Sequence, residues 1–189
     1  DYFRSKDRVI IYIMTMGISF WWVLIYLYVP LFIIEKGFNK GLIGIFLFLV
    51  AFPLIISEYP LSKIAGKKGA KFLFSIAYGS LIAICLAVFF IKSFYLILGL
   101  LVLASFSLAM LEPTTEAYFF DIVGKKGDEN RFYGPYDTSL EIGFMLGKII
   151  PAIILIFLPF NYIFLAFAAF FLFLFLLSFK ARRIIEEKH

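Results

Sequence analysis

Residues 162–179 read YIFLAFAAFFLFLFLLSF, a stretch with no charged side chain and with apolar residues on every face of a helix. A helix of about 20 such residues crosses the hydrocarbon core of a bilayer. A helix that is apolar all round finds no exposed position in a water-soluble fold. The stretch therefore predicts a membrane-spanning helix.

The composition of the whole chain extends this prediction. Hydrophobic residues make up 63% of the 189 residues and charged residues 16%, against about 45–50% and 25% in soluble domains. A soluble domain of this size cannot bury so much apolar surface, whereas lipid removes the need to do so. The lipid bilayer is therefore the first expected partner. Nucleic acid is not expected, because the net charge of +5 is divided among short clusters between apolar stretches.

Short polar breaks rich in Gly, Asn, Pro and charge divide the chain into six apolar stretches. None of the breaks is long enough to hold a soluble domain. We therefore expect residues 1–189 to form a single all-α domain, an integral membrane six-helix bundle. The expected helices cover about residues 8–35, 41–65, 71–92, 94–123, 131–158 and 162–182.

Lysine and arginine are distributed unequally between the two sides of these helices. The richer side holds Arg4, Lys6, Arg8, Lys63, Lys67, Lys68, Lys71, Lys125, Lys126, Arg131, Lys180, Arg182, Arg183 and Lys188. The other side holds only Lys36, Lys40 and Lys92. Because basic loops stay in the cytoplasm, we expect a multi-pass protein of the cell membrane with both termini cytoplasmic.

Ionisable residues inside the expected spans should face protein or water, because an ion exposed to lipid is costly. Glu112 and Glu116 lie four residues apart on one helix face, as do Asp137 and Glu141. The spans 71–92 and 162–182 carry no acid and are expected to face lipid. The candidates for a substrate or ion pathway are Glu58, Glu112, Glu116, Asp137, Glu141 and Lys148.

These acids have two interpretations. Low dielectric disfavours the ionised form of an unpaired carboxylate, which suits a site that binds protons or cations. The same acids suit a cytoplasmic charge network that closes a gate by pairing with Arg131, Lys63 or Lys148. The sequence leaves both interpretations open.

Two adjacent tryptophans in the first span, Trp21 and Trp22, are further pathway candidates. Both lie too deep for an aromatic belt at the membrane surface. Neighbouring helical positions point about 100° apart, so at most one of the two faces a cavity fully. Tyr26 and Tyr28 fit either an external belt or the same cavity.

The stretch EYPLSKIAGKKGAKFLF, residues 58–74, resembles the major facilitator signature G-x-L-A-D-R-x-G-R-K between a second and a third helix. Ser62 stands at the first Gly and Gly66 at the Asp. Lys67 stands at the Arg, Gly69 at the later Gly and Lys71 at the basic end. The resemblance implies that this loop contributes to a cytoplasmic gate.

A second stretch, EPTTEAYFFDIVGKKGDENRFYGPYDTSLEIGFMLGKIIP, resembles the family's passage from a fourth to a fifth helix. Asp121 closes one helix and Arg131 opens the next, both at the cytoplasmic gate. Gly143 and Gly147 allow the fifth helix to approach a neighbour closely. Lys148 stands where the best-known motif has proline.

Major facilitator transporters have two six-helix halves, each built from two inverted three-helix repeats. The degenerate loop motif and the start at Asp1 lead us to expect the carboxyl-terminal half. The resemblance implies a secondary transporter that moves a small solute by alternating access. Its partner is a second six-helix half, from the same chain or a second copy. Protons are the candidate coupling ion, at Glu112 and Glu116, and no cofactor is expected.

The sequence also bears on two other classes of protein. Tyr136-Asp137 resembles half of an intramembrane aspartyl protease motif, but the G-x-G-D partner is missing. The sole histidine, His189, ends the sequence, so no histidine triad or zinc site is expected in the bundle. An enzyme is therefore not expected. A homodimeric half-transporter and a non-transporting assembly partner remain alternatives.

Overall fold

The computed structural model describes residues 1–124 and 127–181, without the side chains of residues 58, 59 and 61–68. The first span begins after a short 3-10 turn, η1 (Tyr2–Arg4), and consists of a helix, a π-helical turn and a second helix. These three segments are α1 (Lys6–Val23), η2 (Leu24–Tyr28) and α2 (Val29–Glu35). The other helices are α3 (Gly41–Lys68), α4 (Ala70–Phe90), α5 (Phe94–Val123), α6 (Glu129–Phe157) and α7 (Tyr162–Ser178). This architecture confirms the predicted all-α six-helix fold.

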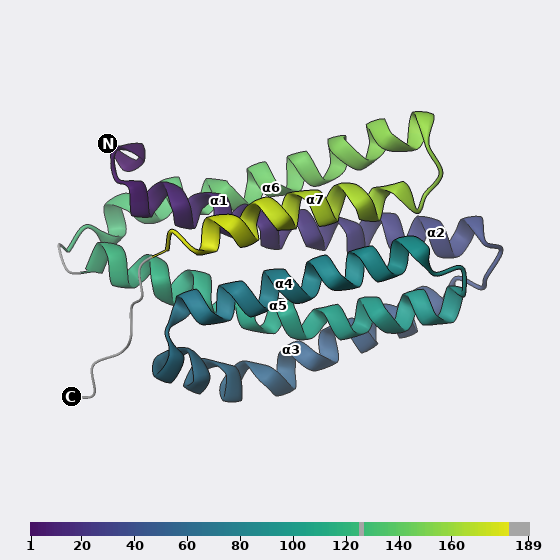
Figure 1. Cartoon of the computed structure of the whole chain (residues 1–189), viewed down its shortest axis with the longest axis horizontal. Helices are drawn as coiled ribbons and strands as arrows, with labels where there is room; N and C mark the ends of the chain where they lie inside the picture. Colours follow the sequence, from purple (N-terminus) through teal and green to yellow (C-terminus); the bar gives the residue numbers. More distant parts are fainter. Residues whose placement is uncertain (125–126, 182–189) are drawn as a thin grey trace.

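Four described stretches are long and apolar enough to cross a bilayer: Lys6–Glu35, Ala70–Phe90, Phe94–Val123 and Glu129–Phe157. Two shorter apolar stretches lie within α3 and α7. The helices run lengthwise in one bundle, and α1 begins at the end of the bundle where α7 ends (Figure 1). The chain is thus a multi-pass membrane protein.

Helix pairing follows an internal symmetry. The most extensive contacts join α1 to α6, α3 to α5 and α4 to α7. Exchanging the first three spans with the last three converts the α1–α6 pair into the α5–α3 pair and keeps α4 with α7. This is the pairing expected of two three-helix repeats. Because each repeat has an odd number of helices, the second repeat crosses the membrane in the opposite direction to the first.

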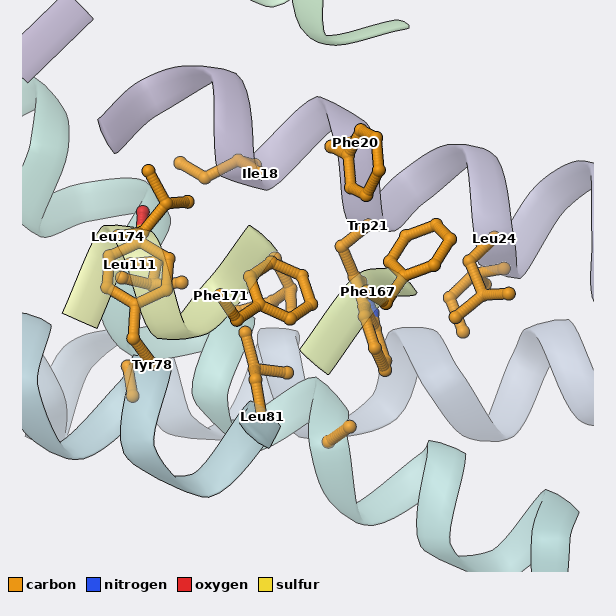
Figure 2. Close-up of a cluster of buried hydrophobic side chains, with 14 of the residues drawn as sticks. Ile18, Phe20, Trp21, Leu24, Tyr78, Leu81, Leu111, Phe167, Phe171 and Leu174 are labelled. Atoms are coloured by element: carbon orange, nitrogen blue, oxygen red, sulfur yellow. The ribbon is translucent and has the colours of Figure 1, made fainter. Parts of the chain in front are cut away.

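A cluster of buried apolar side chains lies where α1, α4, α5 and α7 meet (Figure 2). Trp21 is fully buried there, with its ring 5.8 Å from that of Phe171. Tyr78 of α4 is also fully buried, and its hydroxyl donates a 2.6 Å hydrogen bond to the carbonyl oxygen of Met14. Aromatic packing and a buried hydrogen bond therefore attach α1 to the α4–α7 pair.

On its other side α1 crosses α6 at close range. A Cβ added at Gly143 would collide with Ser19 Oγ and with the carbonyl oxygen of Met16. One added at Gly147 would lie 3.0 Å from Val23. Small residues let two helix backbones approach in a membrane. Gly143 and Gly147 thus set the distance between α1 and α6.

Candidate functional site

A cavity of about 280 Å³ lies between α1, α5 and α6. Its α5 residues lie in the C-terminal half of that helix and most of its α6 residues in the N-terminal half, so it lies nearer the bundle end where α1 begins. The lining residues are Thr15, Ile18, Ser19, Trp22, Glu112, Thr115, Glu116, Tyr133, Tyr136, Asp137, Leu140 and Phe144. Three helices thus build one site inside the span.

The lining combines acids with aromatic rings. The charged side chains that line it, among the residues that the structure describes, are three carboxylates: Glu112, Glu116 and Asp137. No described lysine or arginine lines the cavity. Four aromatic residues and three hydroxyl residues form most of the remaining wall. The electrostatic potential inside is therefore negative wherever these acids are ionised.

Glu112 is held by a tryptophan from the facing helix. Trp22 Nε1 donates a 2.7 Å hydrogen bond to Glu112 Oε1. The Trp22 ring stacks on Tyr26, with centroids 5.0 Å apart and an interplanar angle of 19°. Tyr26 is itself 57% exposed. Glu112, the Trp22 indole and the Tyr26 phenol ring therefore form one series of contacts, in which Tyr26 is not itself among the lining residues.

The first span is not a regular α-helix beside these residues, because it contains the π-helical turn η2. Pro30 has no backbone N–H, so it cannot donate to the carbonyl four residues earlier, that of Tyr26. The Val29 N–H instead bonds to the carbonyl of Leu24, five residues back. Such π-helical turns often occur at functional sites. Here the turn begins two residues after Trp22, at Leu24.

Hydroxyl contacts fix the wall that α6 contributes. Thr15 Oγ1 donates to Tyr136 Oη at 3.2 Å, and the Tyr136 ring stacks on Phe119 with centroids 4.2 Å apart. Tyr12 and Thr138 share a 3.0 Å hydrogen bond closer to the end of the bundle. These contacts hold Tyr136 in place beside Glu116 and Asp137.

The predicted pathway residues fall into three groups. Glu112, Glu116, Asp137 and Trp22 come together in the cavity. Trp21 lies in the core against α7, and the exposed Glu141 and Lys148 of α6 are not among the lining residues. The side chain of Glu58 is outside the described residues.

Glu112 also borders a second space. A smaller cavity of about 130 Å³ lies between α3 and α5 and is lined by Glu112 with Leu54, Ile55, Ala109 and Pro113. Among the described residues, Glu112 is therefore the one shared by the two cavities.

The predicted gate residues lie near the end of the bundle where α1 begins. Gly69, with φ of 83°, precedes α4 in a conformation that favours glycine. Lys71 Nζ donates to the carbonyl oxygen of Phe179 at 2.6 Å, and Arg131 lies 2.8 Å from the carboxylate of Asp1. Asp121 is exposed at the end of α5. The side chains of Ser62, Gly66 and Lys67 are outside the described residues.

Beside this end, Tyr2 of η1 is buried against Phe132 and Tyr12. Burial raises the pKa of Tyr2 well above its usual value. Arg8 donates to the carbonyl of Tyr2 and lies 4.1 Å over the ring of Phe132. The start of the chain is therefore docked on α1 and α6.

Sequence reasoning missed much of the cavity wall. Tyr133, Tyr136, Leu140 and Phe144 recur at three- and four-residue spacing on α6, in register with Asp137. That spacing places them on one helix face. These wall residues could have been predicted from the sequence by selecting the positions that share a helix face with each acid.

A membrane bundle with a polar cavity among its helices has the features of a membrane transport protein. The model of the Major Facilitator Superfamily matches residues 11–188. The chain therefore belongs to this superfamily, whose members are membrane transporters. Searches of curated proteins and of solved structures returned no match.

Proposed function

We propose that this bundle is one half of a secondary active transporter that moves a small solute by alternating access. The observation that supports the proposal is the cavity between α1, α5 and α6, which holds three carboxylates inside the span. Acids at such depth are expensive unless they serve a pathway. A second six-helix half, from the same chain or a second copy, would cover the open side of the cavity.

The exposed face of α6 supports a second half. Only 17% of the most apolar stretch of α6 is buried, whereas the corresponding share is 50% in α5 and 67% in the first span. Asp137 and Glu141 are exposed on this poorly covered helix. Lipid is a poor neighbour for such charges, so protein or an aqueous path is the better cover. We place the cavity end and both termini on the cytoplasmic side of the cell membrane.

Glu112 is the candidate coupling acid. It faces Trp22 and lies close to Tyr26, both on the first span. Among the described residues, the other titratable groups that line the cavity are Glu116 on α5 and Tyr133, Tyr136 and Asp137 on α6, none of which carries a positive charge. In this surrounding a carboxylate that takes up a proton on one side of the membrane and releases it on the other couples solute movement to the proton gradient.

The test is uptake by the intact protein in proteoliposomes with an imposed pH gradient. Sugars, amino acids and organic cations form the solute panel, and Glu112→Gln and Glu116→Gln are compared with wild type. We expect proton-driven transport to fall at least tenfold in Glu112→Gln. Glu35→Gln removes an exposed acid at the other end of the bundle and is the matched control.

Two results count against this proposal. Unchanged proton-driven transport in both cavity variants would make the acids gate or scaffold groups. Failure of the intact protein to move any solute of the panel would favour the assembly partner over the transporter.

A further inference from the structure

We infer that the solute of this cavity is an organic cation with an aromatic or branched apolar body. The inference rests on the proposed transport function and names the substrate class of the same site. It depends on three properties of the cavity: the sign of its charge, its aromatic walls and its size.

The sign of the charge excludes anions. An anion entering the cavity would meet three carboxylates and no described lysine or arginine. A cation would find these carboxylates as counter-ions in a region of low dielectric, where the attraction is stronger than in water. A neutral solute would gain no such attraction.

The aromatic walls favour a cation with little hydration. Trp22, Tyr133, Tyr136 and Phe144 line the cavity next to the acids. Ammonium groups bind over the faces of aromatic rings within about 6 Å of the centroid, and tryptophan is the strongest partner. Trp22 is suited to this role because its indole N–H is already bonded to Glu112, which sets the ring beside the carboxylate.

The size and hydrogen-bonding capacity point to a small organic cation rather than a bare metal ion. The cavity of about 280 Å³ is close to the lower end of small-molecule pockets, about 300–1,000 Å³. Among the described residues, no group of three or more His, Cys, Asp or Glu side chains is placed to hold a metal. The hydroxyls of Thr15, Ser19 and Thr115 also line the cavity. Each already donates within the protein, so toward a solute it can only accept a hydrogen bond from an N–H group.

The experiment measures binding to the intact protein in nanodiscs by calorimetry. Phenyltrimethylammonium is the cationic probe. Benzenesulfonate has a similar size and the opposite charge, and 2-phenylpropan-2-ol is a neutral analogue of similar shape. We expect the cation to bind at least tenfold more tightly than either comparison compound.

Four variants assign the binding to named residues. Glu112→Gln should weaken cation binding at least tenfold, while Glu35→Gln should change it less than twofold. Trp22→Leu should weaken cation binding about fivefold or more. Trp22→Phe, which keeps an aromatic face, should retain most of the affinity. Size-exclusion profiles that match wild type show that each variant is folded.

The inference is overturned if benzenesulfonate or the neutral analogue binds as tightly as the cation, or if the cation does not bind. Unchanged cation affinity in Glu112→Gln, Glu116→Gln and Asp137→Asn together would overturn it as well. The transport assay separates the two proposals. If proton-driven uptake of a neutral or anionic solute depends on Glu112, the proposed transport function is supported and the proposed cationic substrate is wrong.

Discussion

Trp21 and Trp22 are neighbours in the sequence but belong to two different regions of the molecule. Trp21 is fully buried between α1 and α7, where its indole nitrogen has no hydrogen-bond partner among the described residues. Trp22 faces the cavity and donates to Glu112. The rotation of about 100° between adjacent positions thus separates a packing residue from a site residue, and chemical type alone cannot tell them apart.

The two regions differ in how their side chains are used. Around Trp21 the contacts are aromatic and apolar, from Phe167 and Phe171 of α7. Trp22 instead contacts Glu112 of α5 and the exposed ring of Tyr26, and it lines a cavity that also holds Glu116 and Asp137. Substitutions in the first region should reduce stability, and substitutions in the second should reduce ligand binding. The following predictions test this division.

The largest effect is expected at the crossing of α1 and α6. In Gly143→Leu the new side chain meets Ser19 and the backbone of Met16, which cannot move away without separating the helices. We expect loss of the folded bundle, measured as loss of the monodisperse peak in size exclusion. Gly134→Ala on the same helix is the control, because an added Cβ there meets nothing within 4 Å. A folded Gly143→Leu protein would show that the crossing tolerates a wider spacing.

Trp21→Ala and Trp22→Ala compare the two regions directly. Removing the buried Trp21 ring leaves a cavity in the core, and we expect a loss of about 3–5 kcal/mol in the free energy of unfolding. Removing Trp22, which borders an existing cavity, should cost about 1 kcal/mol or less in stability but weaken cation binding about fivefold or more. Unfolding in mixed micelles with increasing SDS measures both. Equal losses of stability would break the division.

The six helices were predictable because their apolar stretches are long and the breaks between them are rich in Gly, Pro and charge. The expected bounds 94–123 coincide with α5, and the others agree within a few residues. The acids of the cavity were predictable because ionisable groups in a span are rare. The apolar stretches, the polar breaks and the ionisable residues within the spans can all be read directly from the order of residues in the sequence.

The rest depends on which way each helix faces, which a single sequence does not define. Trp21 and Trp22 could not be separated, because both flanks of α1 are buried, one by α7 and one by α6. Likewise Glu141 has the same four-residue relation to Asp137 as Glu116 has to Glu112, yet it does not line the cavity. The packing of helices distant in sequence determines these outcomes.

A single hydroxyl in the core should have a smaller effect. Tyr78→Phe removes the buried 2.6 Å hydrogen bond to the carbonyl of Met14 and keeps the ring. Removing one partner of a buried hydrogen bond costs about 1–3 kcal/mol, and bonds inside membranes are at the low end. We expect a loss of about 1 kcal/mol. Tyr26→Phe, at an exposed ring beside the cavity, should leave the stability unchanged.

The smallest stability effect is expected for Thr15→Val in the cavity wall. The valine keeps the branched shape of threonine but cannot donate to Tyr136, whose hydroxyl lies 3.2 Å from Thr15 Oγ1. Hydrogen bonds between membrane helices contribute about 0.6 kcal/mol on average, so unfolding in SDS should change by about that amount. Tyr136 would then lose one of the contacts that fix it beside Asp137, and binding of phenyltrimethylammonium should weaken about twofold to fivefold. If the Thr15→Val variant binds normally but loses more stability than Tyr78→Phe, Thr15 contributes to helix packing, as Trp21 does, and not to the binding site.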